Sequence, residues 1–256
     1  MQKLMLCDDG ELLKVAPLAE TNFWGIELQS FCDPDLIRRE PDAVEKHIST
    51  INKIKQKSLH GPFVDLCPGS SDSTVREVTK NCFDLALGIA RKLNCSDIIL
   101  HHGYVEGLIR PREWISRSTT FWQDFFQSVP DSISVHLENV DNVLDYDPDL
   151  LSEVIVSVGR SNFDVCLDVG HAHYFSNTPV LKWIEQLGHQ IGYVHLNDNH
   201  GKADDHLGLG QGSTAMIEVC QALQKHAPES IWAIEVPVPL INQSIDWLKG
   251  NGFLTK

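Results

Sequence analysis

Short apolar runs alternate along the chain with longer amphipathic stretches. The runs are rich in Ile, Val and Leu and contain few polar residues, which is typical of strands that are covered on both faces in a parallel sheet. This pattern predicts eight strands, at residues 3–7, 25–29, 58–63, 97–103, 132–140, 163–170, 191–198 and 231–237.

The stretches between these strands carry apolar residues three to four positions apart, as on one face of a helix. The clearest examples are residues 75–93, 111–129 and 213–226. Residues that favour helix starts accompany them: Asp72 precedes the first, Pro111 opens the second, and Ser213 is expected to cap the third. Eight strands, each followed by a helix, predict an α/β fold, a single-domain (β/α)8 TIM barrel that spans residues 1–256.

The charge and cysteine content of the chain limit the kinds of molecule that it is expected to bind. The chain has 21 Lys and Arg against 35 Asp and Glu, a formal net charge of −14, and no basic cluster, which disfavours a nucleic-acid partner. The seven cysteines form no CxxC pair and fit a reducing cytoplasm better than a disulfide framework. No run is long enough to span a membrane. We therefore expect a cytoplasmic protein with a small-molecule substrate, and the sequence leaves a homo-oligomer open.

Ionisable side chains lie near the C-terminal ends of seven predicted strands, where barrel enzymes gather their catalytic groups. One such residue has ordinary explanations, because a core histidine is usually hydrogen-bonded and a strand-end carboxylate can cap the next helix. Seven ionisable residues at the same end of one barrel indicate a shared site. Imidazoles and carboxylates without thiolates favour Zn²⁺, Mn²⁺, Fe or Co. The seven residues are Glu27, His60, His101, Glu138, Asp168, His195 and Glu235.

The loop after the seventh predicted strand adds two candidate ligands. Asp204 and His206 are two residues apart, so they point the same way if this segment is extended. They would then close over the rim, although a solvated acidic loop is the ordinary alternative. Three glycines follow, at 208, 210 and 212, and either hold a phosphate at a helix N-terminus or simply make a turn.

Six motifs occur in a fixed order along the chain: LHGPFVDLCPGS, ILHHGY, HLENV, LDVGHAH, HLNDNHGKADDHLGLGQG and IEVP. Together they resemble the xylose isomerase-like TIM barrels, over most of the chain from GIEL to AIEVP. That superfamily contains sugar (phosphate) isomerases and epimerases as well as apurinic-site nucleases of the endonuclease IV type. The resemblance therefore implies a metal enzyme and leaves the reaction open between these two branches.

In the isomerase branch, the resemblance implies one divalent metal held by Glu138, Asp168, His195 and Glu235. Glu138 and Glu235 would also move a proton at the carbon beside a carbonyl that the metal polarises, and His171 would contact the substrate. This chain has Gly201 where ketose 3-epimerases carry an arginine, six residues after the ligand histidine. That departure argues against a ketose 3-epimerase proper.

In the nuclease branch, three zinc ions are held by a larger set of ligands, and every matching position is filled here. Three-metal sites suit hydrolysis of phosphate esters. Against a DNA-repair role, the first strand lacks the expected histidine, and Phe63 stands where tyrosine is expected. The additional ligands would be His60, His101, His171, Asp204 and His206.

We therefore expect a metal-dependent isomerase or epimerase acting on a small sugar, polyol or sugar phosphate. The alternative is a zinc-dependent hydrolase or phosphodiesterase of the AP-endonuclease type with a two- or three-metal site. The expected cofactor is Zn²⁺ or Mn²⁺, one to three ions per chain. Residues expected to contact substrate are His171, Phe63, Tyr104 and Lys202.

Overall fold

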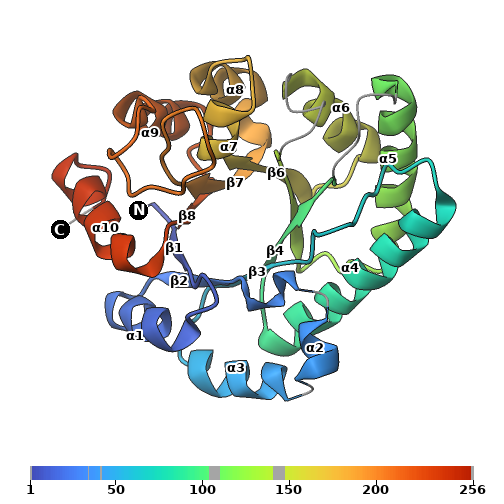
Figure 1. Cartoon of the computed structure of the whole chain (residues 1–256), viewed down its shortest axis with the longest axis horizontal. Helices are drawn as coiled ribbons and strands as arrows, with labels where there is room; N and C mark the ends of the chain where they lie inside the picture. The colour runs from blue at the N-terminus through green and yellow to red at the C-terminus, as the bar shows by residue number, and fades with distance from the viewer. Residues whose placement is uncertain (1, 34, 41, 104–109, 141–147, 255–256) are drawn as a thin grey trace.

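Eight parallel strands close into a barrel in sequence order, and the helices pack around its outside (Figure 1). The computed structural model describes residues 2–33, 35–40, 42–103, 110–140 and 148–254. The single-domain (β/α)8 TIM barrel expected from the sequence is thereby confirmed. The strands are β1 (Leu4–Cys7), β2 (Gly25–Leu28), β3 (Lys57–His60), β4 (Asp97–His101), β5 (Ser134–Glu138), β6 (Phe163–Asp168), β7 (Ile191–Leu196) and β8 (Ile231–Ile234).

The helices occupy the predicted positions between the strands. Short 3₁₀ turns accompany them: η1 (Ser30–Cys32), η3 (Gly188–Gln190) and η4 (Val238–Leu240). The helices are α1 (Leu12–Asn22), α2 (Leu36–Arg39), α3 (Ala43–Ile51), α4 (Ser73–Leu93), α5 (Pro111–Phe125), α6 (Pro148–Val158), α7 (Val169–Tyr174), α8 (Val180–Leu187), α9 (Met216–His226) and α10 (Ile241–Gly250).

Several element boundaries differ from the prediction for local reasons. The sixth strand ends at Asp168 rather than at Gly170, because the Asp168 side chain accepts a hydrogen bond from the His171 amide and caps α7. Asp72 caps α4 as expected. Ser213 does not cap α9, because its amide donates to the Asn199 carbonyl and holds it in the preceding loop.

Apolar side chains fill the layer between the strands and the helices, and a smaller cluster fills the barrel interior around Met5, Ile99 and Tyr193. Below that cluster, near the strand starts, His136 lies between the carboxylates of Asp97 and Asp164. The interior is therefore packed, so that a ligand can enter only from the ends of the barrel.

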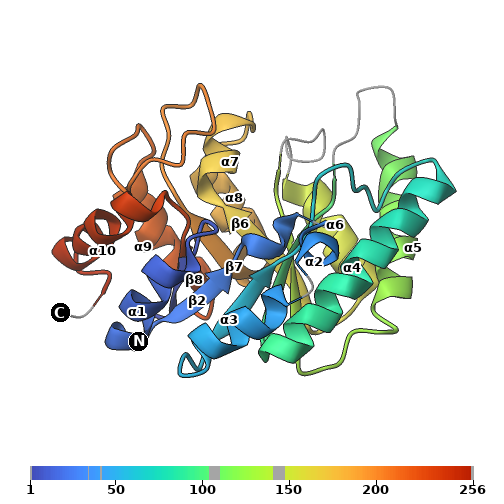
Figure 2. The same ribbon diagram turned by 60° about the horizontal axis from the view of Figure 1, so that its bottom comes forward.

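The loop between β7 and α9 stands at the same end of the barrel as α7, which follows β6 (Figure 2). This is the C-terminal end of the strands, where the motifs of the sequence converge. Within the described part of the chain, no helix combines the length and apolar character needed to cross a bilayer.

Candidate metal centre

Four side chains from adjacent strand ends meet at the rim of the barrel. Glu138 and Asp168 are the last residues of β5 and β6, His195 lies near the end of β7, and Glu235 directly follows β8. The Nδ1 atom of His195 lies 3.2 Å from Glu138 Oε1, 3.2 Å from Glu235 Oε2 and 3.8 Å from Asp168 Oδ2. One ligand atom from each residue falls within 4.8 Å of the others, so the four could hold one metal ion.

A second group lies on one side of Glu138. His60 at the end of β3 and His101 at the end of β4 direct their Nε2 atoms at Glu138 Oε2, at 3.2 and 3.0 Å. The opposite oxygen, Oε1, faces His195. Glu138 therefore belongs both to this group and to the four-residue group.

A third group forms where the loop after β7 closes over the rim. The Nε2 atoms of His171 and His206 both lie 3.3 Å from Asp204 Oδ2. Asp204 and His206 thus contact each other, but His206 has a backbone φ of +47°, so the segment is not the extended one that the prediction assumed. The three groups bring together all nine residues that the sequence singled out as ligands.

Three of the histidines are oriented by main-chain carbonyls on the side away from the ligand groups. A carbonyl oxygen only accepts, so each Nδ1 donates its proton there, and a ring that gives up its second proton to a bound cation presents the Nε2 lone pair to the group it faces. Metal-binding histidines commonly show this arrangement. The acceptors are the oxygens of Gly61, Asn139 and Glu235, at 3.0, 2.8 and 3.0 Å from the Nδ1 atoms of His60, His171 and His206.

Two asparagines hold Asp168 in place. Asn139 donates to the Asp168 carbonyl at 3.0 Å and accepts from its amide at 2.7 Å, while its own carbonyl orients His171. Asn197 donates to Asp168 Oδ2 at 2.8 Å. Asn139 directly follows Glu138 in the chain, and the sequence prediction missed Asn197 although it lies two residues after a ligand histidine.

Glu27 lies one layer deeper than the other rim acids. Its register partner on β3 is Ser58, two residues before His60, so its carboxylate is completely buried. Glu27 Oε2 lies 3.2 Å from His195 Nε2 and accepts a hydrogen bond from the Tyr193 hydroxyl at 2.8 Å. Glu27 therefore orients His195 from below, with the Nδ1 atom of that ring left toward the four-residue group.

The buried charges shift the pKa values of the two rim glutamates in opposite directions. Burial disfavours ionisation of Glu138, but the charges of His195 and His101 outweigh it and hold the pKa of Glu138 well below its ordinary value. Burial raises the pKa of Glu235 to about 7, opposed by His195 and reinforced by Asp168. The two carboxyls therefore differ in protonation near neutral pH.

The donor set fits a divalent cation. The Oε2 atom of Glu235 is buried yet accepts no hydrogen bond from the described residues. In the third group, burial alone would lower the pKa of His206, but Asp204 and Glu235 raise it to about 10. Protons on the histidines thus balance the carboxylates in the metal-free protein, and a bound cation would take over that role.

A cavity of about 480 Å³ opens above the ligand groups. Phe63 lines it, and its ring stacks on His101 with centroids 4.6 Å apart. Lys202 is exposed and does not line this cavity. Tyr104, the other expected substrate contact, lies outside the described residues. Asp9, Gln29 and Cys32 also line the cavity and had no part in the sequence prediction.

The glycine-rich part of the loop wraps around a residue of its own chain. The buried carboxylate of Asp198 accepts hydrogen bonds from the amides of Gly210, Gly212 and Thr214, at 3.1, 2.9 and 3.2 Å. A Cβ atom at Gly212 would lie 2.3 Å from Asp198 Oδ1. These amides are already used, so the loop makes a turn and offers no phosphate cradle here.

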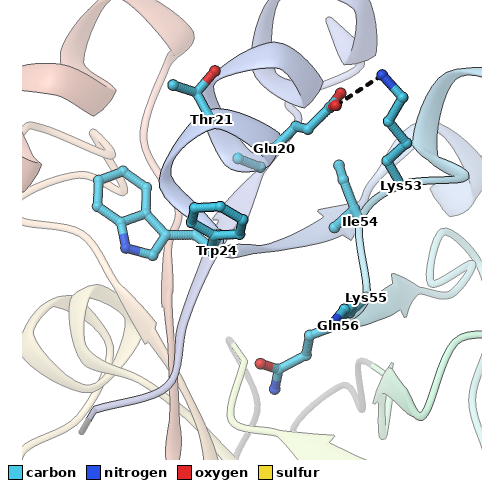
Figure 3. A pocket seen from close by; sticks show the side chains of 9 residues that line it. Glu20, Thr21, Trp24, Lys53, Ile54, Lys55 and Gln56 are labelled. Atoms are coloured by element: carbon cyan, nitrogen blue, oxygen red, sulfur yellow. Dashed lines mark ion pairs between the residues drawn. The ribbon is translucent and has the colours of Figure 1, made fainter.

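A second hollow, of about 600 Å³, lies where α1 meets β2 and before β3 begins (Figure 3). Its wall includes Trp24 and Ile54, and its Glu20–Lys53 ion pair is 3.0 Å long. This hollow is at the N-terminal end of the strands, where conserved structure serves stability rather than catalysis in such barrels. It contains none of the three ligand groups.

Comparison with known proteins agrees with the fold. Among curated sequences, the uncharacterized protein MJ1311 of Methanocaldococcus jannaschii is 29% identical over 189 residues, which cover 69% of this chain and 63% of that protein. The match thus spans less than two thirds of the relative's length.

Among solved structures, a D-tagatose 3-epimerase-like protein superposes with a TM-score of 0.83 at 26% identity, covering 98% of this chain and 97% of that one. The IolI protein with a bound zinc atom superposes with a TM-score of 0.80 at 17% identity over 100% of both chains, which shows a shared fold. A sequence profile described as xylose isomerase-like TIM barrel matches residues 15–251. This protein therefore belongs to the family of xylose isomerase-like TIM barrels.

Proposed function

We propose that this protein is a divalent-metal-dependent isomerase or epimerase that acts on a small sugar, polyol or sugar phosphate by proton transfer beside a carbonyl. The observation that carries the proposal is the position of Glu138 and Glu235. Both face the same cavity, and both belong to the four-residue ligand group with Asp168 and His195. A metal and two proton-transfer groups would thus act on one bound substrate.

Proton transfer at carbon needs an ionised base and a group that can return a proton. In the metal-free protein Glu138 is ionised near neutral pH, because His195 and His101 hold its pKa low. Glu235, with a pKa raised to about 7 by burial, exists in both forms in the metal-free protein. Paired carboxyls whose environments push their pKa values apart are a common basis for acid and base roles. We assign Glu138 as the base and Glu235 as the proton donor.

The four-residue group is the strongest of the three for a first cation. It offers three carboxylates and one imidazole, whereas each flanking group offers two imidazoles and one carboxylate. Hard, charged oxygen ligands favour Mn²⁺ and are also accepted by Zn²⁺. When bound, such an ion polarises a substrate carbonyl and so acidifies the adjacent C–H bond.

Sugar chemistry is supported by the likeness to the D-tagatose 3-epimerase-like structure. The chain differs at one position from the ketose 3-epimerases, which carry an arginine there. Gly201 stands six residues after His195 and has a backbone φ of +67°, in the left-handed region that favours glycine. An arginine at this position would be strained, which supports a substrate other than that of the ketose 3-epimerases.

Solvent exchange tests the proposal. Protein loaded with Mn²⁺ is incubated in D₂O with a panel of aldoses, ketoses and their phosphates, and deuterium at carbon is followed by NMR. We expect exchange with at least one sugar, and a loss of about 10²- to 10⁴-fold in Glu138→Gln and in Glu235→Gln. The exposed Glu229→Gln is the matched control and should leave exchange unchanged. Turnover of a sugar without deuterium uptake would contradict the roles of both glutamates.

A zinc-dependent hydrolase or phosphodiesterase with a two- or three-metal site is the second candidate. The flanking groups favour it, because the Nδ1 atoms of His60, His171 and His206 lie against main-chain carbonyl oxygens, which leaves each Nε2 atom facing its ligand group. Closely spaced cations activate a water molecule and stabilise the charge that develops on a phosphate.

Metal content separates the two candidates. Elemental analysis of protein purified without added metal should give near one ion per chain for the isomerase and two or three zincs for the hydrolase. The double variant Asp204→Ala/His206→Ala should keep the single ion in the first case and lose metal in the second. Asp205→Ala, an exposed acid in the same loop, is the control. Zinc-dependent cleavage of bis-p-nitrophenyl phosphate that this double variant abolishes would favour the hydrolase.

A further inference from the structure

The C-terminal end of α1 holds a phenylalanine in an unfavourable backbone conformation. Phe23 caps this helix with a φ of +58°, and its amide closes on the Glu20 carbonyl at 3.3 Å. Glycine is usual at such a helix end, because a Cβ atom is strained there. Helix α4 ends in the same conformation on Asn94, a residue type that tolerates it. Phe23 therefore costs the fold stability at this position.

The Phe23 side chain gains little packing in return. It is 96% exposed, the largest value among the exposed large hydrophobic residues of the described chain. It is also the only apolar residue among the described non-glycine residues with a positive φ, the others being Asp9, Asp65, Asn94 and His206. A residue that breaks a local rule of folding without a structural gain points to a function.

Phe23 lines the hollow between α1, β2 and the segment before β3. Trp24 lies on one side of this hollow, and residues 53–56 form the facing wall (Figure 3). Trp24 is half-buried, so the fold fixes its indole while part of the ring stays open to a ligand. The volume of about 600 Å³ lies within the range of about 300–1,000 Å³ that small-molecule sites occupy. Two aromatic side chains at such a hollow favour a planar aromatic ring as the ligand.

The wall of the hollow has one positive charge in surplus. Glu20 and Lys53 neutralise each other in an ion pair of 3.0 Å. The ammonium group of Lys55 is exposed and makes no ion pair with the described residues, and the side-chain amide of Gln56 makes no hydrogen bond with them. Because the whole chain has a net charge of −14, this surplus is a local exception, and it attracts an anion.

A second copy of this chain is a poorer occupant of the hollow. Lys249 adds a positive charge beside it, with its Nζ atom 5.4 Å from the centroid of the Trp24 ring. A two-fold interface over this surface would bring the lysines of both copies together, and like charges in an interface repel. The charge surplus therefore favours an anionic ligand over self-association.

We propose that this hollow binds a small planar aromatic anion, at the opposite end of the barrel from the metal centre. The ring of the ligand packs between Trp24 and Phe23, which thereby loses its exposure. The anionic group, a carboxylate or a phosphate, pairs with Lys55 and accepts a hydrogen bond from the Gln56 amide. Binding of this kind needs no metal, so the inference is independent of the proposed isomerase.

Dye binding tests this site. The metal-free protein is titrated with anilinonaphthalene sulfonate, an aromatic probe with one negative charge, and its emission is excited through tryptophan. We expect saturable binding. Naphthoate should displace the dye at a lower concentration than naphthamide, which has the same ring without the charge. Absence of saturable binding, or equal displacement by the two compounds, would overturn the proposal.

The variant Phe23→Gly separates ligand binding from folding. Glycine relaxes the backbone and removes a side chain that packs on little, so the midpoint of thermal unfolding should stay the same or rise. The dye should bind about tenfold more weakly, because one of the two aromatic contacts is lost. Leu13→Ala, at another exposed apolar residue of α1, is the matched control and should change neither value. Lower stability of Phe23→Gly, or unchanged dye binding, would contradict the role of Phe23.

The variant Lys55→Gln tests the charge of the site. It should weaken dye binding about threefold at low salt and remove the advantage of naphthoate over naphthamide. Lys92→Gln, the same change at an exposed position of α4, should alter neither, and an equal effect of the two variants would contradict the role of Lys55. Sedimentation of the wild-type protein reveals the other occupant. A dimer that Phe23→Gly dissociates would overturn the ligand site and assign this surface to a second copy.

Discussion

A buried ion cluster closes the N-terminal end of the barrel and allows a quantitative test of its electrostatics. His136 is 2% exposed, its Nε2 lies 2.9 Å from Asp97 Oδ1, and its Nδ1 contacts Asp164 Oδ1. Burial alone would lower the pKa of His136, but the carboxylates of Asp164 and Asp97 outweigh it and raise the pKa to about 10. The ring is therefore a buried imidazolium that bridges two aspartates at neutral pH.

The substitution His136→Gln removes that positive charge and leaves two negative ones. Removing one partner of a buried ion pair typically costs about 3–5 kcal/mol, because the remaining charge is uncompensated. Asp164 keeps 28% of its side chain exposed and is partly solvated, so most of the penalty falls on Asp97. We expect a loss of about 3 kcal/mol in the free energy of unfolding at pH 7, at the lower end of that range.

The stabilising contribution of His136 decreases as the pH rises. The pKa of His136 in the folded protein lies above its value of about 6.5 in the unfolded chain. The bound proton therefore contributes fully to the free energy of unfolding below pH 6.5, and this contribution is lost as the pH rises toward 10. The stability difference between wild type and His136→Gln should therefore shrink across that window, by at most about 1.4 kcal/mol per pH unit. Taking the difference cancels the other titrating groups that both proteins share.

Urea unfolding followed by circular dichroism at several pH values measures this difference. His189→Gln, an exposed histidine in η3, is the matched control and should cost under about 0.5 kcal/mol. A cost below about 1 kcal/mol for His136→Gln at pH 7, or a difference that does not change between pH 6.5 and 10, would refute the bridging imidazolium.

Two further predictions follow from contacts around the metal centre. Glu27→Gln should weaken metal binding about 10- to 100-fold in a chelator competition assay, because the amide no longer orients His195 as a carboxylate does; unchanged affinity would contradict this role. Gly212→Ala should lower stability by about 1–3 kcal/mol in thermal unfolding, since its Cβ would lie 2.3 Å from Asp198 Oδ1. A neutral result would show that the loop around Asp198 can shift to accept the methyl group.

The barrel itself was readable from the sequence, because strands buried on both faces leave apolar runs that are hard to mistake. Eight of the nine ligand candidates were also visible, since strand ends and one loop concentrate acids and imidazoles, and the family resemblance added His171. That Glu27 lies a layer below the rim was not readable, because it depends on the pairing of Glu27 with Ser58 across β2 and β3. Strand register is a tertiary property that a single sequence does not display.

Loop residues were the least predictable part of the site. Asp9 and Gln29 line the cavity only because the chain turns sharply after β1 and η1 follows β2. The glycines after His206 were compatible with either a phosphate-binding loop or a simple turn. The structure favours the turn, because the buried carboxylate of Asp198 already accepts hydrogen bonds from the loop amides. The conformation of such a loop depends on which side chain accepts the hydrogen bonds of its backbone amides, and this partner cannot be read from the sequence of the loop itself.

One divalent cation, bound by the four-residue group, is proposed to serve the proton transfer that Glu138 and Glu235 carry out on the substrate. An anomalous difference map from crystals grown with stoichiometric Mn²⁺ tests it most directly. We predict a single strong peak between Glu138, Asp168, His195 and Glu235, with the imidazoles of the flanking groups free to meet substrate. Peaks of equal height at His171–Asp204–His206 and at His60–His101, or no peak at the four-residue group, would contradict the account.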